Sequence, residues 1–192
     1  ALPAFAQDAP PPERKGIDID VKGGARRVLI PMAIPDTKET AGDTQGVAGT
    51  VEQTLRRDFD LSGFFKVLPN DSFFFDPKKE GMNTSQINFQ NWFNVGAQAL
   101  VKSSASVVGG KVILDLRLFV VDKGQPVRLK FKSKPVTRDG VKDVVHEFVN
   151  AVLEYYTGEA GIFGSRIAYV SRKKGGFKQI YVMDMDGTGA AK

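Results

Sequence analysis

The stretch DTQGVAGTVEQTLRRDFDLSGFFKVL, residues 43–68, predicts a helix, a stop and a strand in direct succession. Four apolar residues recur at every fourth position and so share one face of a helix: Val47, Val51, Leu55 and Phe59. Gly63 follows as a helix C-terminal residue, and FFKVL at 64–68 returns as a strand. A helix that leads directly into a strand predicts a domain in which helices pack on a sheet.

The chain before this helix predicts two strands of different kinds. GIDIDVKGG, residues 16–24, alternates apolar and charged residues, so one face of the strand is dry and the other wet. Such a short strand suits the edge of a sheet, where it can pair with its own sheet or with another protein. RVLIPMA, residues 27–33, predicts a strand buried on both faces, with Pro31 constraining its end.

A short helix and a three-stranded meander are expected further along the chain. INFQNWFNVG, residues 87–96, predicts a helix that ends near Gly96 and presents three aromatic residues on one face: Phe89, Trp92 and Phe93. Apolar-rich stretches at 97–108, 110–122 and 126–136 then predict three strands joined by glycine-containing turns.

The clearest helix is VKDVVHEFVNAVLEYYTG, residues 141–158. Its apolar residues follow a 3.6-residue spacing, and Gly158 closes it. Together these elements predict an α/β (α+β) domain over residues 16–160, with two main helices packed on a mixed β-sheet.

The last stretch, SRIAYVSRKKGGFKQIYVMDMDGTGAAK at residues 165–192, predicts a hairpin. Two strand-like runs, 167–170 and 179–183, flank a charged Gly-Gly turn. One hairpin cannot bury its own apolar face in water. Residues 161–192 are therefore expected to begin a further β-domain, and the hairpin to be poorly ordered or held only by contacts with the first domain.

The N-terminal residues predict export. In ALPAFAQ, Ala4 and Ala6 flank Phe5 in the A-x-A pattern that signal peptidase cuts, so residues 1–6 are expected to be the remnant of a signal peptide cleaved after Ala6. Residues 7–15, QDAPPPERK, contain three consecutive prolines that hold the chain extended and predict a tether.

Composition excludes several classes of protein. The 192 residues, 42% of them hydrophobic, suffice for one ordinary domain with an appendage, and no run approaches the roughly 18 apolar residues that span a bilayer. The chain has no cysteine, which removes disulfides, thiolate metal sites and cysteine nucleophiles. The net charge of +5 comes without a dense Lys/Arg block, which favours a solvated surface over a nucleic-acid site.

No catalytic, metal or cofactor site is predicted. His146 is the only histidine and is expected to be exposed on the polar flank of its helix, so no Ser-His-acid set follows. Carboxylates are scattered, and no glycine pair precedes the Lys-Ser/Thr of a phosphate-binding loop. DMDG at 184–187 lacks the later acidic ligands of a calcium loop and is expected to be a turn. These observations favour a binding or scaffold protein that is not an enzyme.

Two features leave alternatives open. The phenylalanines at 73–75 can cover the sheet or form an exposed patch for a partner. The strand expected at 126–136 has basic residues on one face, and this face is either simply solvated or a site for anionic groups. Its cations are Arg128, Lys130, Lys132 and Lys134.

Several stretches resemble the TolB family of the Tol-Pal envelope system. LRRDFDLSGFFKVL at 55–68, VGAQALVKS at 95–103 and LRLFVVDKG at 116–124 carry part of the resemblance. TGEAGIFGSRIAYVS at 157–171 is the most specific stretch, because it combines a helix end, a glycine-bearing connector and the entry into a propeller blade. YVMDMDGTG at 181–189 is similar to the strand-turn signature of TolB-type blades. The order of these motifs over about residues 16–189 carries more weight than any one of them.

The resemblance implies a periplasmic adaptor without enzymatic activity or cofactor. It implies an N-terminal TolB-like domain followed by the first hairpin of a truncated β-propeller, with further blades beyond residue 192. A TolA-like inner-membrane protein and a Pal-like lipoprotein are the implied partners, the latter bound by the missing blades. The resemblance also implies a monomer that does not bind nucleic acid and does not insert into a membrane. The implied role lies in outer-membrane invagination during cell division and in envelope integrity.

The implied TolA-type contact lies on the N-terminal edge strand, at Ile17, Asp18, Ile19, Asp20 and Val21. This placement agrees with the alternating pattern of that strand. We expect the segment to exchange between a state docked on its own domain and a released state that a partner captures. The proline-rich stretch at 7–15 precedes it, so the motif does not begin at the mature N-terminus.

Two other functions stay open. The first is a nucleic-acid-binding α/β domain that uses the basic strand, since the TolB N-terminal domain is similar in fold to some RNA-binding domains; the export signal counts against it. The second is the accessory domain of a propeller-type peptidase, since TolB-type blades also occur in peptidases. The second reading requires a catalytic domain beyond residue 192.

Overall fold

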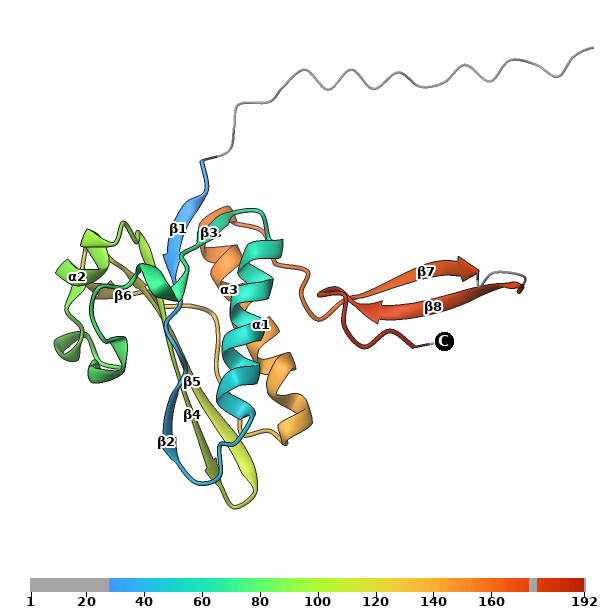
Figure 1. The fold of residues 1–192 in the computed structure, drawn as a ribbon, viewed down its shortest axis with the longest axis horizontal. Coiled ribbons are helices and arrows are strands. Elements are labelled where there is room, and N and C mark those ends of the chain that lie inside the picture. Colours follow the sequence, from blue (N-terminus) through green and yellow to red (C-terminus); the bar gives the residue numbers. More distant parts are fainter. Residues whose placement is uncertain (1–27, 173–175, 192) are drawn as a thin grey trace, which may run out of the picture.

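The computed structural model describes residues 28–172 and 176–191. These residues form a six-stranded mixed sheet with two long helices on one face, followed by a separate two-stranded hairpin (Figure 1). The expected α+β class is confirmed. The expected signal-peptide remnant at 1–6, the tether at 7–15 and the strand at 16–24 lie outside the described residues.

The sheet is built around one long strand, β4 (Ala99–Val108). On one side, β1 (Ile30–Ala33) lies parallel to β4 and to β3 (Phe65–Val67). On the other side, β5 (Lys111–Val120) runs antiparallel to β4 and leads into the two-residue strand β6 (Gln125–Pro126). Within the described part of the strand expected at 27–33, residues 30–33 form β1 and residues 28–29 precede it.

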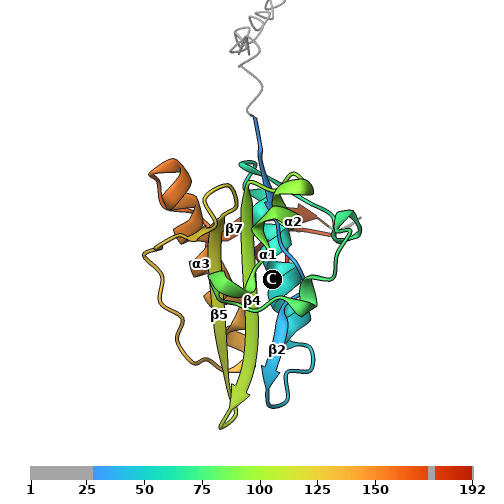
Figure 2. The ribbon, with the colours of Figure 1, turned by 90° about the vertical axis from the view of Figure 1, so that its left-hand side faces the viewer.

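The sequence does not predict β2 (Lys38–Ala41). β2 pairs in parallel with residues 104–106 of β4, while β1 pairs with residues 99–100, so the two strands share one side of β4 at different heights (Figure 2). All four β2 residues are exposed, and no apolar alternation reveals the strand. Among the described residues β4 is the only strand that pairs with β2, so the opposite edge of β2 is open.

The helices α1 (Val47–Leu61) and α3 (Val141–Thr157) pack side by side on the sheet (Figure 1). The expected apolar face of α1 is fully buried, and the Phe59 ring meets Phe65 of β3 edge on, with 5.2 Å between ring centres. Both helices end as expected, because Gly63 and Gly158 adopt positive φ angles after the last turns. The core between helices and sheet continues beyond α3 to Phe163.

Arg56 of α1 also holds the helix to the sheet, through hydrogen bonds at the ends of two strands. Its guanidinium donates to the carbonyls of Ile34 and Leu68, both at 2.7 Å, just after β1 and β3 end. It also donates to Asn70 Oδ1 at 2.9 Å. One charged side chain therefore satisfies the carbonyls at the ends of two parallel strands.

The loop after β3 contains three short 3₁₀ turns, η1 (Asn70–Ser72), η2 (Pro77–Lys79) and η3 (Thr84–Gln86). Phe73 and Phe75 pack edge on against Trp92, with 5.0 and 4.8 Å between ring centres. Two of the three phenylalanines at 73–75 thus cover a second cluster of buried apolar residues, which includes Trp92 and is distinct from the core under α1 and α3. Phe74 is exposed.

The short helix α2 (Phe89–Asn94) forms where it was expected, but its aromatic residues do not share one face. Trp92 is fully buried, whereas Phe93 is 60% exposed. Successive helical residues are rotated by about 100° around the axis. With Trp92 turned into the core, Phe93 therefore faces outward.

The prediction of a strand over residues 126–136 is wrong. β6 pairs with β5 for two residues only, and the chain returns to β5 at a single bridge between Val136 and Val112. Pro126 and Pro135 flank the stretch between these points and lack the N–H that a continuous ladder requires. The Phe131 ring instead packs on Phe148 of α3, so the apolar residues turn inward without forming a strand.

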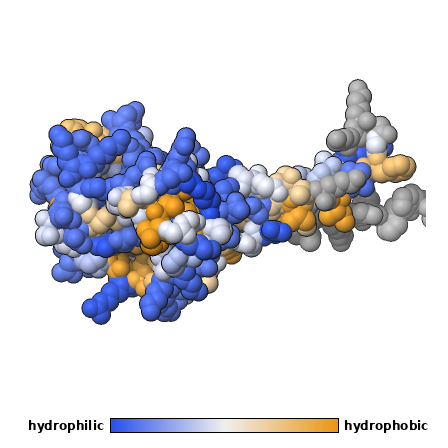
Figure 3. All heavy atoms as spheres, turned by 90° about the horizontal axis from the view of Figure 1, so that it is seen from below, coloured by the Kyte–Doolittle hydropathy of each residue, from blue (hydrophilic) through white to orange (hydrophobic). Residues whose placement is uncertain are grey.

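β7 (Arg166–Arg172) and β8 (Lys178–Asp184) form the expected hairpin, and residues 184–187 form the expected turn. Hydrophobic residues lie along the hairpin surface in Figure 3. Val170, Phe177 and Ile180 are 62%, 91% and 68% exposed. Within the described residues the hairpin therefore carries an uncovered apolar surface.

The turn after β2 provides a test of the β2–β4 pairing. Gly42 has a φ of 73°, and a Cβ there would lie 2.1 Å from the Val107 carbonyl oxygen, whereas Gly46 has a φ of 75° in open space. We expect Gly46→Ala to lower the free energy of unfolding by about 1–2 kcal/mol, the usual cost of a left-handed L residue. Gly42→Ala should lower it further, because Val107 must also move. Urea denaturation measures both losses, and equal losses would contradict the importance of this contact.

Candidate functional site

The residues expected to contact a TolA-type partner lie outside the described residues: Ile17, Asp18, Ile19, Asp20 and Val21. Their placement stays a prediction. The described chain begins at Val28, whose side chain is 89% exposed, and enters the sheet two residues later as β1. Two polar sites stand out within the described part of the molecule.

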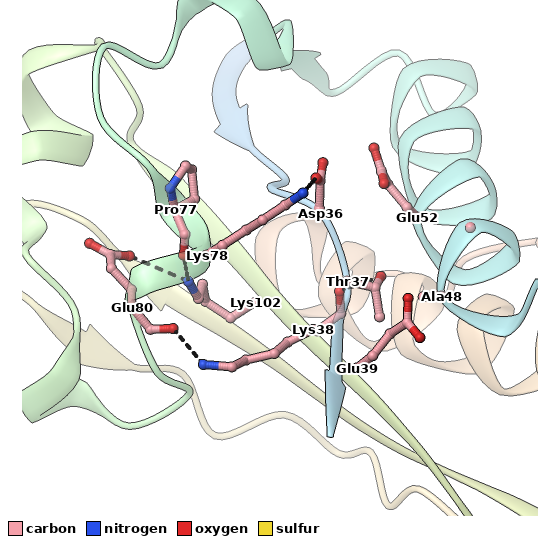
Figure 4. A pocket seen from close by; sticks show the side chains of 12 residues that line it. Asp36, Thr37, Lys38, Glu39, Ala48, Glu52, Pro77, Lys78, Glu80 and Lys102 are labelled. Atoms are coloured by element: carbon pink, nitrogen blue, oxygen red, sulfur yellow. Dashed lines mark hydrogen bonds and ion pairs between the residues drawn. The ribbon is translucent and has the colours of Figure 1, made fainter. Parts of the chain in front are cut away.

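The first site is a groove of about 420 Å³ beside β2 (Figure 4). It is lined by four segments: residues 36–39 leading into β2, residues 48–52 in the first turns of α1, residues 77–80 around η2, and residues 102–103 of β4. The groove therefore follows the strand that the sequence does not predict, between a helix and a loop.

A buried ion pair forms the base of the groove. Lys102 Nζ lies 3.3 Å from Glu80 Oε2, and the two side chains are only 6% and 9% exposed. Glu80 also accepts the Trp92 indole N–H at 2.9 Å and the Asn88 backbone N–H at 3.0 Å. Burial lowers the pKa of Lys102, although the charge and hydrogen bond of Glu80 oppose this. These bonds compensate the buried carboxylate and hold the η2 loop on β4.

The lysines on the η2 side of the groove already contact other groups of the protein. Lys38 Nζ donates to the Glu80 carbonyl at 3.1 Å, and Lys78 Nζ pairs with Asp36 at 3.1 Å. Figure 4 shows both lysines reaching across this side. Their charges are directed into contacts within the protein.

The wall on the α1 side is acidic. Glu39 and Lys38 point to opposite sides of β2 (Figure 4), and Glu52 stands one turn into α1. Glu39 accepts from the Thr44 hydroxyl, and Glu52 accepts from Asn70 at 3.1 Å. Within the described residues no cationic side chain pairs with either carboxylate.

The second site joins α1 to α3. Asp58 Oδ2 lies 2.7 Å from His146 Nδ1, and the side chains are 0% and 8% exposed. The expectation that His146 is exposed is therefore wrong, because α1 packs over the flank of α3 that carries it. Asp58 is the matching carboxylate, at a position of α1 that also faces inward.

The same site holds the connector, residues 158–165 between α3 and β7, and the base of the hairpin. His146 stacks on the Phe163 ring, with 6.3 Å between ring centres. The Asn150 side chain donates to the Phe163 carbonyl at 2.8 Å and accepts its N–H at 3.0 Å. Asp186 follows β8, is almost fully buried, and its Oδ2 lies 3.9 Å from Nζ of Lys142 in the first turn of α3. The hairpin is therefore attached to the helices at its base.

The charges around His146 make this site sensitive to protonation. Burial tends to lower the pKa of His146, but the hydrogen bond and charge of Asp58, aided by Asp186 and Asp143, raise it above its ordinary value. Burial raises the pKa of Asp58 against the opposing effects of His146 and Arg57. Both shifts mean that the folded pair binds protons more tightly than the unfolded chain does.

No group of three or more His, Cys, Asp or Glu residues suited to a metal ion occurs in residues 28–172 and 176–191. Over the same ranges no helix has both the length and the apolar composition required to cross a membrane. Each site joins separate segments of the protein through a buried pair, Lys102 with Glu80 in the first and His146 with Asp58 in the second.

The basic face considered for nucleic acid is not a strand face. Its four cations are exposed on the irregular stretch between β6 and Val136: Arg128, Lys130, Lys132 and Lys134. Lys130 pairs with Glu154 of α3. The regular row of cations that a strand would present is therefore absent from this part of the described chain.

Sequence reasoning missed both sites. The groove depends on β2, which has no apolar pattern. Asp58 carried a weak signal, since it lies three residues after Leu55 and one before Phe59, within the apolar face of α1. A carboxylate at such a position requires a buried partner, and His146 is the only histidine available.

The arrangement defines a class: a two-layer α+β domain whose last helix passes through an anchored connector into a β-hairpin. The chain belongs to the TolB family, because the family model described as the TolB amino-terminal domain matches residues 17–127.

Curated relatives named Tol-Pal system protein TolB extend the match. The protein from Myxococcus xanthus is 36% identical over 90% of this chain and 39% of its own length. The protein from Anaeromyxobacter dehalogenans is 33% identical over 97% of this chain and 42% of its own length. The chain thus spans about two fifths of the length of these relatives.

A solved structure supports the fold. The crystal structure of TolB from Acinetobacter baumannii superposes with a TM-score of 0.61 over 85% of this chain and 38% of that chain, at 20% identity. At this identity the likeness concerns the fold alone. The family assignment rests on the sequence matches.

The pair of Asp58 and His146 generates a prediction about pH. In His146→Asn the amide nitrogen replaces Nδ1 as a donor but cannot titrate, whereas His146→Leu leaves Asp58 buried without a donor. We expect His146→Leu to lose about 3 kcal/mol of stability at pH 6, and His146→Asn to lose less.

The sign of the pH dependence follows from the raised pKa of His146. Its stabilising effect is complete below the unfolded value of about 6.5 and is lost as the pH rises through the folded value. Urea denaturation between pH 5.5 and 8.5 should show the wild type losing stability relative to His146→Asn as the pH increases. Parallel curves for these two proteins would contradict the assigned shift.

Proposed function

We propose that the protein acts as a periplasmic adaptor of the Tol-Pal system and has no catalytic activity. In this role it links a TolA-like inner-membrane protein to a Pal-like outer-membrane lipoprotein, during outer-membrane invagination at cell division and in the maintenance of envelope integrity. The observation that carries the proposal is the family match, which begins at Ile17, the first residue of the proposed TolA contact, and runs to residue 127.

The alternating segment supports an extended mode of binding for the TolA-like partner. In an extended conformation Ile17, Ile19 and Val21 would share one side of this segment, and Asp18 and Asp20 the other. Such a segment can add as a strand to the open sheet edge of another protein, where backbone hydrogen bonds give affinity and one row of side chains gives specificity.

The contact with a Pal-like partner is proposed for the part of the relatives' length that this chain does not span. The hairpin is the described element that would adjoin that part, and its exposed apolar residues suit packing against further blades. We propose a monomer that is exported to the periplasm after cleavage following Ala6.

Calorimetric titration with the periplasmic C-terminal domain of TolA from the same organism tests the proposal. We expect the 192-residue chain to bind, and deletion of residues 16–22 to abolish binding. Deletion of residues 8–14, which shortens only the proline-rich tether, is the matched control and should leave affinity within about threefold.

Point variants separate the two faces of the segment. Ile17→Asp combined with Ile19→Asp should lower affinity at least tenfold, because the apolar side must be buried on the partner. Asp18→Asn combined with Asp20→Asn keeps that side intact and should bind more strongly than the Ile17/Ile19 variant. Binding that survives deletion of residues 16–22 would remove the contact from this segment, and no binding by the folded chain would overturn the adaptor role proposed for it.

A further inference from the structure

The groove beside β2 has the form of a site for strand addition. β2 pairs with β4 on one edge, and no described strand occupies its other edge. The groove follows the chain from Asp36 through Glu39, with α1 on one side and η2 on the other (Figure 4). An open strand edge beside a helix offers unpaired backbone groups and flanking pockets to an extended peptide.

Gly49 keeps the groove open. It lies in the first turn of α1, and apart from its chain neighbours and the local helix backbone no heavy atom lies within 4 Å of the position where its Cβ would stand. Its φ is not positive, so the backbone does not require glycine there. Glycine within a helix destabilises it relative to alanine. Glycine at this position therefore costs helix stability while it leaves space beside Glu52 and β2.

The groove is also rigid where it meets β4. The Thr37 and Ser103 hydroxyls lie 2.8 Å apart and are buried, and the pair of Lys102 and Glu80 fixes the η2 side. A site that is already formed loses little conformational entropy when a ligand binds.

The unpaired charges of the groove define the chemistry of its occupant. Lys38 donates to the Glu80 carbonyl and Lys78 pairs with Asp36. Glu39 and Glu52 form no close ion pair among the described residues, although the charge of Glu52 helps, after Asp36, to raise the pKa of Lys78. The chain as a whole carries a net charge of +5, so this acidic wall stands out against the average surface. A lysine or arginine side chain would complement it.

We propose that this groove is a second docking site, at which an extended segment of a partner protein pairs with β2 and places a Lys or Arg side chain between Glu39 and Glu52. The site is separate from the segment at residues 17–21. That segment carries Asp18 and Asp20, and its carboxylates would face the same acidic wall, so charge complementarity disfavours it as the occupant.

Two blocked heptapeptides probe the site in the full 192-residue chain, one of alternating valine and lysine and one of alternating valine and glutamate. We expect the lysine peptide to shift the backbone amide resonances of residues 38–41 and 48–52 in a ¹⁵N NMR titration, and to bind at least tenfold more tightly than the glutamate peptide. Trp92, the only tryptophan, donates to Glu80 at the base of the groove and gives a fluorescence readout of the same event.

Variants of α1 test the location. Gly49→Leu fills the groove and removes a helical glycine, so it should weaken the lysine peptide at least tenfold while thermal denaturation shows no loss of stability. Gln53→Leu, one turn further and outside the groove lining, is the matched control and should bind as the wild type does. Glu52→Gln keeps an acceptor for Asn70 but removes the charge, and should weaken the lysine peptide selectively.

Several results would overturn the proposal. Equal affinity for the two peptides would remove the charge argument, and shifts confined to other elements would remove the location. Unchanged binding by Gly49→Leu would show that the groove is not occupied. Concentration-dependent self-association in sedimentation, abolished by Gly49→Leu, would assign the groove to a second copy of this chain instead of a partner.

Discussion

A carboxylate without exposed surface lies between the two main helices, and the arrangement around it follows from the need to compensate its charge. Asp58 requires a buried donor, and His146 supplies it from α3. The ring of His146 then stacks on Phe163, which Asn150 holds through two hydrogen bonds. The relative position of α1, α3 and the connector is thus specified by polar contacts within an otherwise apolar core.

Much of the fold could be predicted from the sequence because its main elements follow apolar periodicity. The faces of α1 and α3 repeat at the helical period, and β5 alternates at the strand period. β4 is instead a continuous buried run between two glycine-containing turns. β2 could not be predicted, because all its residues are exposed and its place depends on pairing with a strand more than 60 residues away. The stretch at 126–136 has the strand period, but its prolines and the packing of Phe131 on α3 decide otherwise.

The candidate sites were harder to predict than the fold, since each depends on residues that are distant in the sequence. Asp58 and His146 are 88 residues apart, and neither has a local pattern that reveals the other. The groove combines residues from four segments, and its acidic wall exists only because β2 turns Glu39 toward α1. α1 contributes to both sites, with Gly49 in its first turn and Asp58 near its end, about 14 Å apart along the helix axis.

The anchoring of Phe163 has a consequence for the order in which the polypeptide folds. During synthesis from the N-terminus, the residues of β1 to β5 are made first. The core is complete only when Phe163 packs into it, and Phe163 lies several residues beyond the end of α3. Several paired strands are also far apart in the sequence, so the chain loses more conformational entropy when these strands are brought together. The domain therefore reaches its native packing only when the polypeptide that leads into the hairpin is already present, which makes the connector part of the folding unit and not merely a linker after it.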